Sequence, residues 1–266
     1  MTKLKDSIRR ISAIILDMDG VLYLGRKPIK GAAKAVAFLR GSGKKVIFLT
    51  NNSENSRLTY LKKLSQMGIT ASHEEVVTSG QVAADYVKKK NSRARVFAIG
   101  GRGLMAEIRK AGLRIASPKK ATHLVVGIDR AITYNKIDAG LQALLSGAKF
   151  IATNPDNIFP TSKGLTPGAG AIIGALERSS SRKPDVIIGK PYLHAIRFGL
   201  RILETRPSET AIIGDQIATD IKAGKRIGLT TILVLSGVTK KGDIARVKGT
   251  KNEPDFIVDS LEGVIT

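Results

Sequence analysis

The chain has 266 residues, enough for one large domain or two modest ones with a sizeable core. It contains no cysteine, which excludes disulfides, thiolate metal sites and a cysteine nucleophile. No stretch reaches the roughly 18 to 20 apolar residues that span a bilayer, so we expect a cytoplasmic protein without a membrane segment. Lys and Arg number 44 against 22 Asp and Glu. Because the basic residues are scattered and few aromatic residues accompany them, we expect a solvated basic surface and no nucleic-acid partner.

The predicted elements alternate between strands and helices in chain order. Short apolar runs predict strands at 12–19, 45–51, 95–100, 123–129, 149–154, 185–190, 210–215 and 230–235. Helical periodicity follows or separates them at 30–40, 57–67, 104–111, 135–145, 193–203 and 217–227. Uninterrupted apolar strands that alternate with helices indicate parallel sheets covered on both faces. The predicted fold class is therefore α/β.

Four of the predicted strands end in polar groups. These are Asp17 with Asp19, Thr50 with Asn51 and Asn52, Lys190, and Asp215. Ligands of open parallel sheets bind beyond the carboxyl ends of the strands, so one sheet could bring the four ends together. Two of them precede residue 55 and two follow residue 185. The simplest architecture is a Rossmann-like parallel-sheet core formed by 1–79 and 185–266, with an α/β cap domain inserted at 80–184.

The polar groups at these ends suit one kind of chemistry. The closely spaced carboxylates of Asp17 and Asp19 call for a cation, and Asp215 is a natural partner for an oxygen-preferring metal such as Mg²⁺. Lys190 offers a fixed positive charge, and Thr50 offers a neutral hydrogen-bond donor. Each group alone has an ordinary explanation, since Asp-Gly is a common turn and a lysine before proline is usually exposed. Together they indicate phosphoryl transfer.

The four ends also form a set of ordered motifs. They read DMDGVLY at 17–23, FLTNN at 48–52, GKP at 189–191 and GDQIATD at 214–220. In this order they resemble the haloacid dehalogenase superfamily of aspartyl-phosphate enzymes, and the resemblance covers essentially the whole chain. It implies that Asp17 is the nucleophile and Asp19 the acid and base. The dehalogenase branch lacks an aspartate two residues after the nucleophile, so Asp19 argues against dehalogenation.

The resemblance also implies roles for the remaining motif residues. Thr50 and Asn51, with Asn52 beside them, would bind the transferring phosphoryl group. Lys190 would balance the negative charge of the nucleophile and the phosphoryl group.

The same resemblance implies a magnesium site. Mg²⁺ would be held by the Asp17 carboxylate, the Asp19 backbone carbonyl and Asp215. Asp220 would orient Lys190 or a metal-bound water.

The insert between the second and third motifs narrows the resemblance. Residues 125–172 are similar to the cap of the NagD-like, or 4-nitrophenylphosphatase-like, subfamily, which includes phosphatases for phosphoglycolate, pyridoxal phosphate and nucleotides. The loop NPDNIFP at 154–160 is expected to face the site, where Phe159 would offer a flat apolar contact to the leaving group. A packed loop aromatic is the structural alternative for Phe159.

We therefore predict a Mg²⁺-dependent phosphatase that hydrolyses small phosphorylated metabolites through an aspartyl-phosphate. One alternative is a phosphotransferase that uses an alcohol acceptor. Another is a non-enzymatic phosphoacceptor or binding module, which Asp19, Lys190 and the cap disfavour. The substrate and assembly into a homodimer stay open.

Overall fold

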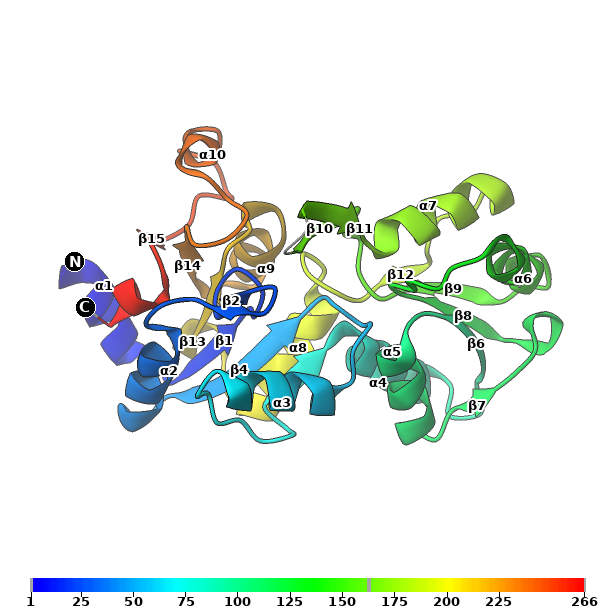
Figure 1. Cartoon of the computed structure of the whole chain (residues 1–266), viewed down its shortest axis with the longest axis horizontal. Coiled ribbons are helices and arrows are strands. Elements are labelled where there is room, and N and C mark those ends of the chain that lie inside the picture. Colours follow the sequence, from blue (N-terminus) through cyan, green and yellow to red (C-terminus); the bar gives the residue numbers. More distant parts are fainter. Residues whose placement is uncertain (1, 162–163, 266) are drawn as a thin grey trace.

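The computed structural model describes residues 2–161 and 164–265 and contains two parallel sheets that lie side by side (Figure 1). The first is six-stranded, in the order β15-β14-β13-β1-β4-β5, with all its strands parallel. Its strands are β1 (Ala13–Leu16), β4 (Lys45–Thr50), β5 (Val76–Thr78), β13 (Thr210–Gly214), β14 (Thr230–Val234) and β15 (Phe256–Val258). The predicted α/β class is confirmed.

Helices cover both faces of the first sheet, which explains why its central strands are apolar throughout. Ile14 and Leu16 of β1 join the apolar cluster of one face, while Ala13 and Ile15 join the other. The first face packs on α1 (Thr2–Arg10), α2 (Ala32–Gly41) and α3 (Arg57–Gln66). The second packs on α8 (Leu193–Leu203) and α9 (Lys222–Ile227). The short helix α10 (Lys241–Ala245) and the β2–β3 hairpin (Tyr23–Leu24, Lys27–Pro28) complete this part.

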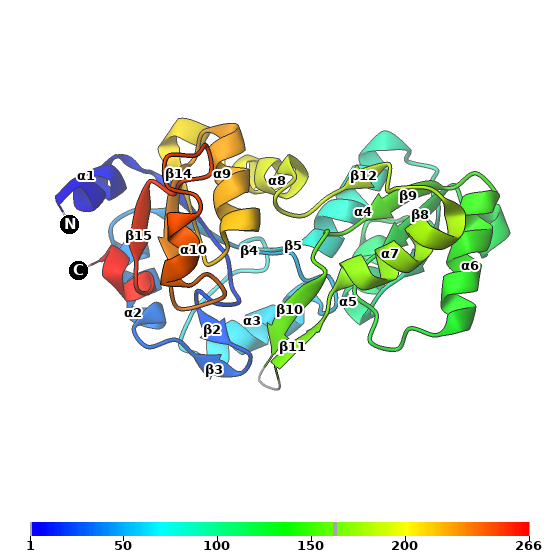
Figure 2. The same ribbon diagram turned by 90° about the horizontal axis from the view of Figure 1, so that it is seen from above.

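The second sheet is five-stranded and parallel, in the order β12-β9-β8-β6-β7. Its strands are β6 (Arg95–Ile99), β7 (Arg114–Ile115), β8 (His123–Val126), β9 (Lys149–Ala152) and β12 (Val186–Ile187). Its helices are α4 (Ser79–Lys90), α5 (Arg102–Lys110), α6 (Tyr134–Leu145) and α7 (Ala169–Ser180). An antiparallel hairpin, β10 (Ile158–Thr161) with β11 (Gly164–Pro167), extends from this half toward the first sheet (Figure 2).

The strand that leads to Lys190 differs from the prediction. We expected residues 185–190 to lie in the same sheet as the other three polar ends. Instead β12 pairs with β9 of the second sheet, Val186 with Ile151 and Ile187 with Ala152. The Asp185 carboxylate also accepts a hydrogen bond from the Phe150 backbone N–H, at 2.6 Å, which holds β12 at this edge. The domain limits at 79/80 and 184/185 stay a prediction, but strand pairing places 186–187 with the second sheet.

A continuous apolar cluster joins the two halves. Leu49 and Val77 of the first sheet belong to the same buried cluster as Val125 and Ile151 of the second. The two halves therefore share a continuous apolar core. Among the helices of residues 2–161 and 164–265, none combines the length and apolar character needed to cross a membrane.

Candidate active site

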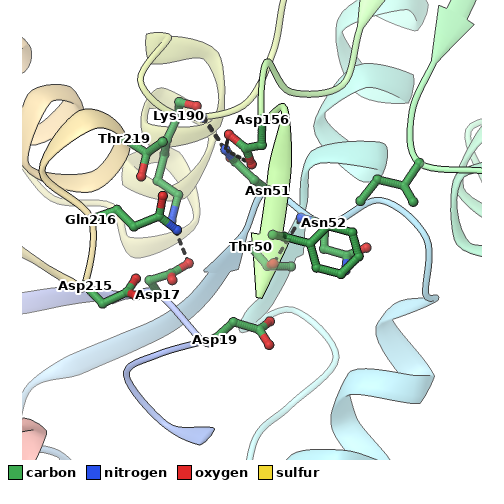
Figure 3. Close-up of a pocket in the computed structure, with 12 residues that line it drawn as sticks. Asp17, Asp19, Thr50, Asn51, Asn52, Asp156, Lys190, Asp215, Gln216 and Thr219 are labelled. Atoms are coloured by element: carbon green, nitrogen blue, oxygen red, sulfur yellow. Dashed lines mark hydrogen bonds and ion pairs between the residues drawn. The ribbon is translucent and has the colours of Figure 1, made fainter. Parts of the chain in front are cut away.

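A cavity lies beyond the carboxyl ends of β1, β4 and β13, where the first sheet faces the loop after β9 (Figure 3). Eight of the nine predicted site residues line it: Asp17, Asp19, Thr50, Asn51, Asn52, Phe159, Lys190 and Asp215. The ninth, Asp220, lies behind Lys190 and is fully buried. The residues that the strand ends predicted to meet are therefore brought together, although Lys190 arrives from the second sheet.

Lys190 bridges two carboxylates at the floor of the cavity. Its Nζ donates to Asp17 Oδ1 at 2.7 Å and to Asp220 Oδ1 at 2.6 Å. Burial by itself lowers the pKa of Lys190, but the charges of Asp17 and Asp220 outweigh it and raise that pKa above its ordinary value. The lysine is therefore held as a cation against Asp17.

Three buried carboxylates converge at this point and could hold a metal ion. Asp17, Asp215 and Asp220 each offer an oxygen within 4.8 Å of the others. Asp215 Oδ2 accepts from the Val238 backbone N–H at 2.6 Å, while Oδ1 is buried without a hydrogen-bond partner in the described chain. Three carboxylates against one lysine leave excess negative charge, and hard oxygen donors suit Mg²⁺. The donor set therefore fits a divalent cation.

Burial and neighbouring charges both shift the pKa values of these carboxylates. Burial and the charge of Asp220 raise the pKa of Asp215 to about 7. Burial also raises the pKa of Asp17, although the neighbouring Lys190 opposes the rise. Close packing fixes the arrangement, because Gly20 has φ of +83° and a Cβ there would overlap the Asp215 carboxylate.

Asp19 lies apart from these three carboxylates, on the side of the cavity away from Lys190 (Figure 3). The Tyr23 hydroxyl donates to Asp19 Oδ2 at 3.4 Å. Burial raises the pKa of Asp19, while the charge of Lys63 opposes that rise. Asp19 is thus a separate carboxyl group, with its protonated form favoured relative to a solvated aspartate.

Thr50 and Asn52 shape the turn after β4. Thr50 Oγ1 accepts from the Asn52 backbone N–H at 3.1 Å, and Asn52 Oδ1 accepts from the Glu54 backbone N–H at 2.8 Å. Thr50 and Asn52 both line the cavity. These turn bonds hold both side chains at its wall.

The Asn51 side chain is engaged within the protein. Its Oδ1 accepts from the Lys190 backbone N–H at 2.8 Å, and its Nδ2 donates to the Lys190 carbonyl at 2.9 Å and to Asp156 Oδ2 at 3.0 Å. An amide nitrogen has two hydrogens, so both are used. The predicted contact of Asn51 with a phosphoryl group would require its side chain to exchange one of these bonds, and it stays a prediction.

Asp156 is a site residue that the sequence reasoning missed. It follows β9, lines the cavity and lies next to Asn51 (Figure 3). Burial raises the pKa of Asp156 to about 6, opposed by the hydrogen bond from Asn51. The signal was available, because the Asn154-Pro155-Asp156 stretch also follows a buried parallel strand, the pattern used for the other four ends.

Phe159 lies on β10, half-buried, with its side chain at the cavity. The Arg130 guanidinium carbon is 5.5 Å from the centre of its ring, and Arg130 pairs with Glu54 at 2.7 Å. Phe159 therefore both packs against a neighbour and forms part of the wall.

Comparison with known proteins adds to this geometry. The sequence pattern of haloacid dehalogenase-like hydrolases matches residues 14–114, and that of a related group matches 187–264. The chain is 37% identical to an acid sugar phosphatase of Staphylococcus epidermidis over 89% of this chain and 91% of that one. A p-nitrophenyl phosphatase from Archaeoglobus fulgidus superposes with a TM-score of 0.90 at 38% identity, covering 96% of this chain and 98% of that one. NagD from E. coli K-12 superposes with a TM-score of 0.87 at 30% identity, covering 95% of this chain and 97% of that one.

Proposed function

Since the chain belongs to the haloacid dehalogenase-like hydrolase family and is a phosphatase of that family, we propose that it hydrolyses small phosphomonoesters with Mg²⁺ through a phosphorylated Asp17. The observation that carries the proposal is the placement of Asp17. Its Oδ1 is bonded to the buried Lys190, at the floor of a cavity that also holds Asp215. A nucleophile, a cation and metal-binding carboxylates at one strand end are what phosphoryl transfer needs.

In the first step, Asp17 Oδ2 attacks phosphorus in line with the leaving oxygen. The P–O bond to the alcohol breaks as the bond to Asp17 forms. Lys190 stays on Oδ1 and balances charge on the carboxylate and the phosphoryl group. Mg²⁺, held by Asp17, Asp215 and the Asp19 backbone carbonyl, would offset the repulsion between a carboxylate and a phosphate dianion.

Asp19 serves as acid and then base. It donates its proton to the departing alkoxide, a role that is helped by burial, which raises the pKa of Asp19. The resulting carboxylate then accepts a proton from the water that attacks phosphorus of the aspartyl-phosphate. Phosphate leaves, Asp17 is restored as a carboxylate and Asp19 is again protonated.

The substrate class is a small phosphomonoester. The cavity wall combines the carboxylates and lysine with Phe159 and Ile128, which offer apolar contacts to a leaving group. The relatives are named for sugar phosphates and for p-nitrophenyl phosphate, so substrates of both kinds belong in the test.

The test is phosphate release from a panel of phosphomonoesters, including aromatic, sugar and short-chain esters, with Mg²⁺ and with EDTA. We expect turnover with Mg²⁺ for at least one ester and none with EDTA. An acceptor alcohol is added in a parallel series to detect phosphoryl transfer. A chain that releases no phosphate from any ester, or that does so equally well in EDTA, would contradict the proposal.

Phe159→Ala tests whether the hairpin selects the leaving group. We expect kcat/KM to fall roughly 5- to 150-fold, about 1 to 3 kcal/mol, for an ester that stacks there, and much less for a small polar ester. Tyr134→Ala is the control, because Tyr134 is an exposed aromatic residue on α6. A uniform fall across all esters would show that Phe159 supports the site without selecting among substrates.

A further inference from the structure

The Asn51 amide connects three parts of the chain. Besides its side-chain bonds, its backbone carbonyl accepts from Asn154 Nδ2 at 2.8 Å and from the Ser79 hydroxyl. Asn51 follows β4 of the first sheet, whereas Asn154 follows β9 of the second. One residue at the catalytic strand end therefore bonds both halves of the molecule.

The side chain of Asn51 forms a two-point clamp on Lys190. The amide oxygen accepts from the Lys190 N–H, and the amide nitrogen donates to the Lys190 carbonyl. The clamp works in one orientation only, since an amide turned by 180° would oppose donor to donor and acceptor to acceptor. The position of the Lys190 backbone, and so the reach of Nζ to Asp17, depends on how this amide is held.

Asp156 supplies the remaining restraint on the amide. Its carboxylate oxygens lie 3.0 and 3.3 Å from Asn51 Nδ2. It is half-buried and forms no ion pair within residues 2–161 and 164–265, although the charge of Lys190 opposes the rise of its pKa, so its direct side-chain bond is the one to Asn51. A carboxylate acceptor favours the nitrogen side of the amide and strengthens the bond.

We propose that Asp156 is a positioning residue, which from the second half of the molecule holds the Asn51 amide and through it fixes Lys190 against Asp17. The inference rests on the proposed function, because its consequence is the rate of phosphoryl transfer. It implies that Lys190 reaches its position against Asp17 only when the 153–157 loop is packed against Asn51. Asp156 then affects every substrate alike, since it acts on the lysine and not on the leaving group.

The first experiment measures kcat and KM of wild type, Asp156→Ala and Asp156→Asn with the three classes of ester. Wild-type turnover tests the proposed function by itself. For Asp156→Ala we expect kcat to fall roughly 10- to 100-fold with little change in KM, equally for all esters, as for loss of a charge-assisted hydrogen bond. Asp156→Asn keeps an acceptor oxygen and should recover much of the loss. Asp138→Ala, an exposed aspartate of α6, is the control. Losses that differ among the esters would overturn the inference.

The second experiment is a double-mutant cycle with Asn51→Ala. If Asp156 acts through the amide, adding Asp156→Ala to Asn51→Ala should cause no further loss. Multiplied losses would mean that Asp156 acts elsewhere and would overturn the inference. A crystal structure of Asp156→Ala gives a readout that does not need turnover. We expect a reoriented Asn51 amide and a displaced Lys190, and an unchanged Lys190 would overturn the inference.

Discussion

Two buried ionic clusters in this molecule make an instructive contrast. Arg57 of α3 and Glu107 of α5 form a two-pronged pair, with Nε to Oε1 at 2.9 Å and Nη2 to Oε2 at 3.1 Å. The other cluster sets Lys190 against Asp17 and Asp220, with Asp215 close by. The first pairs one cation with one anion, whereas the second has three anions for one cation.

The difference indicates that the first cluster stabilises the fold and the second binds ligands. A matched pair with ideal geometry satisfies its own charges and ties α3 of the first half to α5 of the second. In the unmatched cluster three carboxylates share one lysine, and burial, together with the charge of Asp220, raises the pKa values of Asp17 and Asp215. Burying three carboxylates together lowers the stability of the fold, and it leaves a preorganised site for a cation and a phosphoryl group.

The largest expected effect comes from removing the nucleophile. Asp17→Asn should lower turnover roughly 10³-fold or more, because an amide cannot form the phosphorylated intermediate. Folding should survive, since the change removes one member of a like-charge cluster. Phosphate release and a melting curve measure both. Near wild-type turnover would remove Asp17 from the mechanism.

Breaking the matched Arg57–Glu107 pair should lower stability and leave turnover nearly unchanged. Glu107→Ala leaves Arg57 buried and unpaired, which should cost about 3 to 5 kcal/mol of unfolding free energy. Glu107 does not line the cavity, so kcat/KM at a temperature where the variant is folded should change little. Urea unfolding gives the first value.

A paired replacement is the control for that prediction. Arg57→Met with Glu107→Leu should restore most of the stability, because two apolar groups leave no buried charge. If the double variant were as unstable as Glu107→Ala, lost packing would explain the result better than an unpaired charge.

Magnesium should stabilise only the unmatched cluster. A ligand that binds the folded state at 100 times its Kd adds about 2.7 kcal/mol. We therefore expect Mg²⁺ to raise the Tm of wild type and of a Glu107→Gln variant, and not that of Asp215→Asn. Melting curves in a Mg²⁺ titration test this without turnover. An equal rise in Asp215→Asn would place the ion elsewhere.

The smallest expected effect is a pH dependence at Asp156. Its raised pKa means that the folded state binds the Asp156 proton more tightly than the unfolded state does. Proton binding therefore stabilises the fold fully below the ordinary pKa near 4, and this stabilisation is lost as pH rises through about 6. The Asp156→Asn variant does not titrate and so does not lose this stability. Its free energy of unfolding relative to that of wild type should therefore rise by about 2 to 3 kcal/mol between pH 4 and pH 8. Urea unfolding at both pH values decides, and a constant difference would contradict the assigned shift.

The sequence predicted the class, most of the strands and the meeting of the polar ends, because each of these depends on local apolar patterns and on a rule about parallel sheets. Among the elements it missed are α1, α4, α10, β5 and β15, whose apolar patterns are short or weak. It also placed the strand before Lys190 in the first sheet, since a two-residue strand carries no signal for its partner.

The misses within the site have a similar cause. Asp156 was not predicted, because its bond to Asn51 joins residues 105 positions apart and forms only when the two halves pack together. The contact of the Asn51 amide with a phosphoryl group stays a prediction, and the sequence could not show the bonds of that amide to Lys190. The Arg57–Glu107 pair joins residues 50 positions apart, a contact that only the packing of two halves creates.

The central claim is that the phosphoryl group passes through Asp17. Asp19→Asn should slow hydrolysis of the intermediate because it removes the base, while p-nitrophenolate leaves without a proton donor. The measurement is rapid acid quench of this variant with p-nitrophenyl phosphate, followed by mass spectrometry of the peptides. We predict a phosphate on Asp17 that forms at the same rate as the burst of p-nitrophenol. The phosphate should be absent from the double variant that carries both Asp17→Asn and Asp19→Asn. A phosphate on another residue, or a burst without any phosphorylated peptide, would contradict the account.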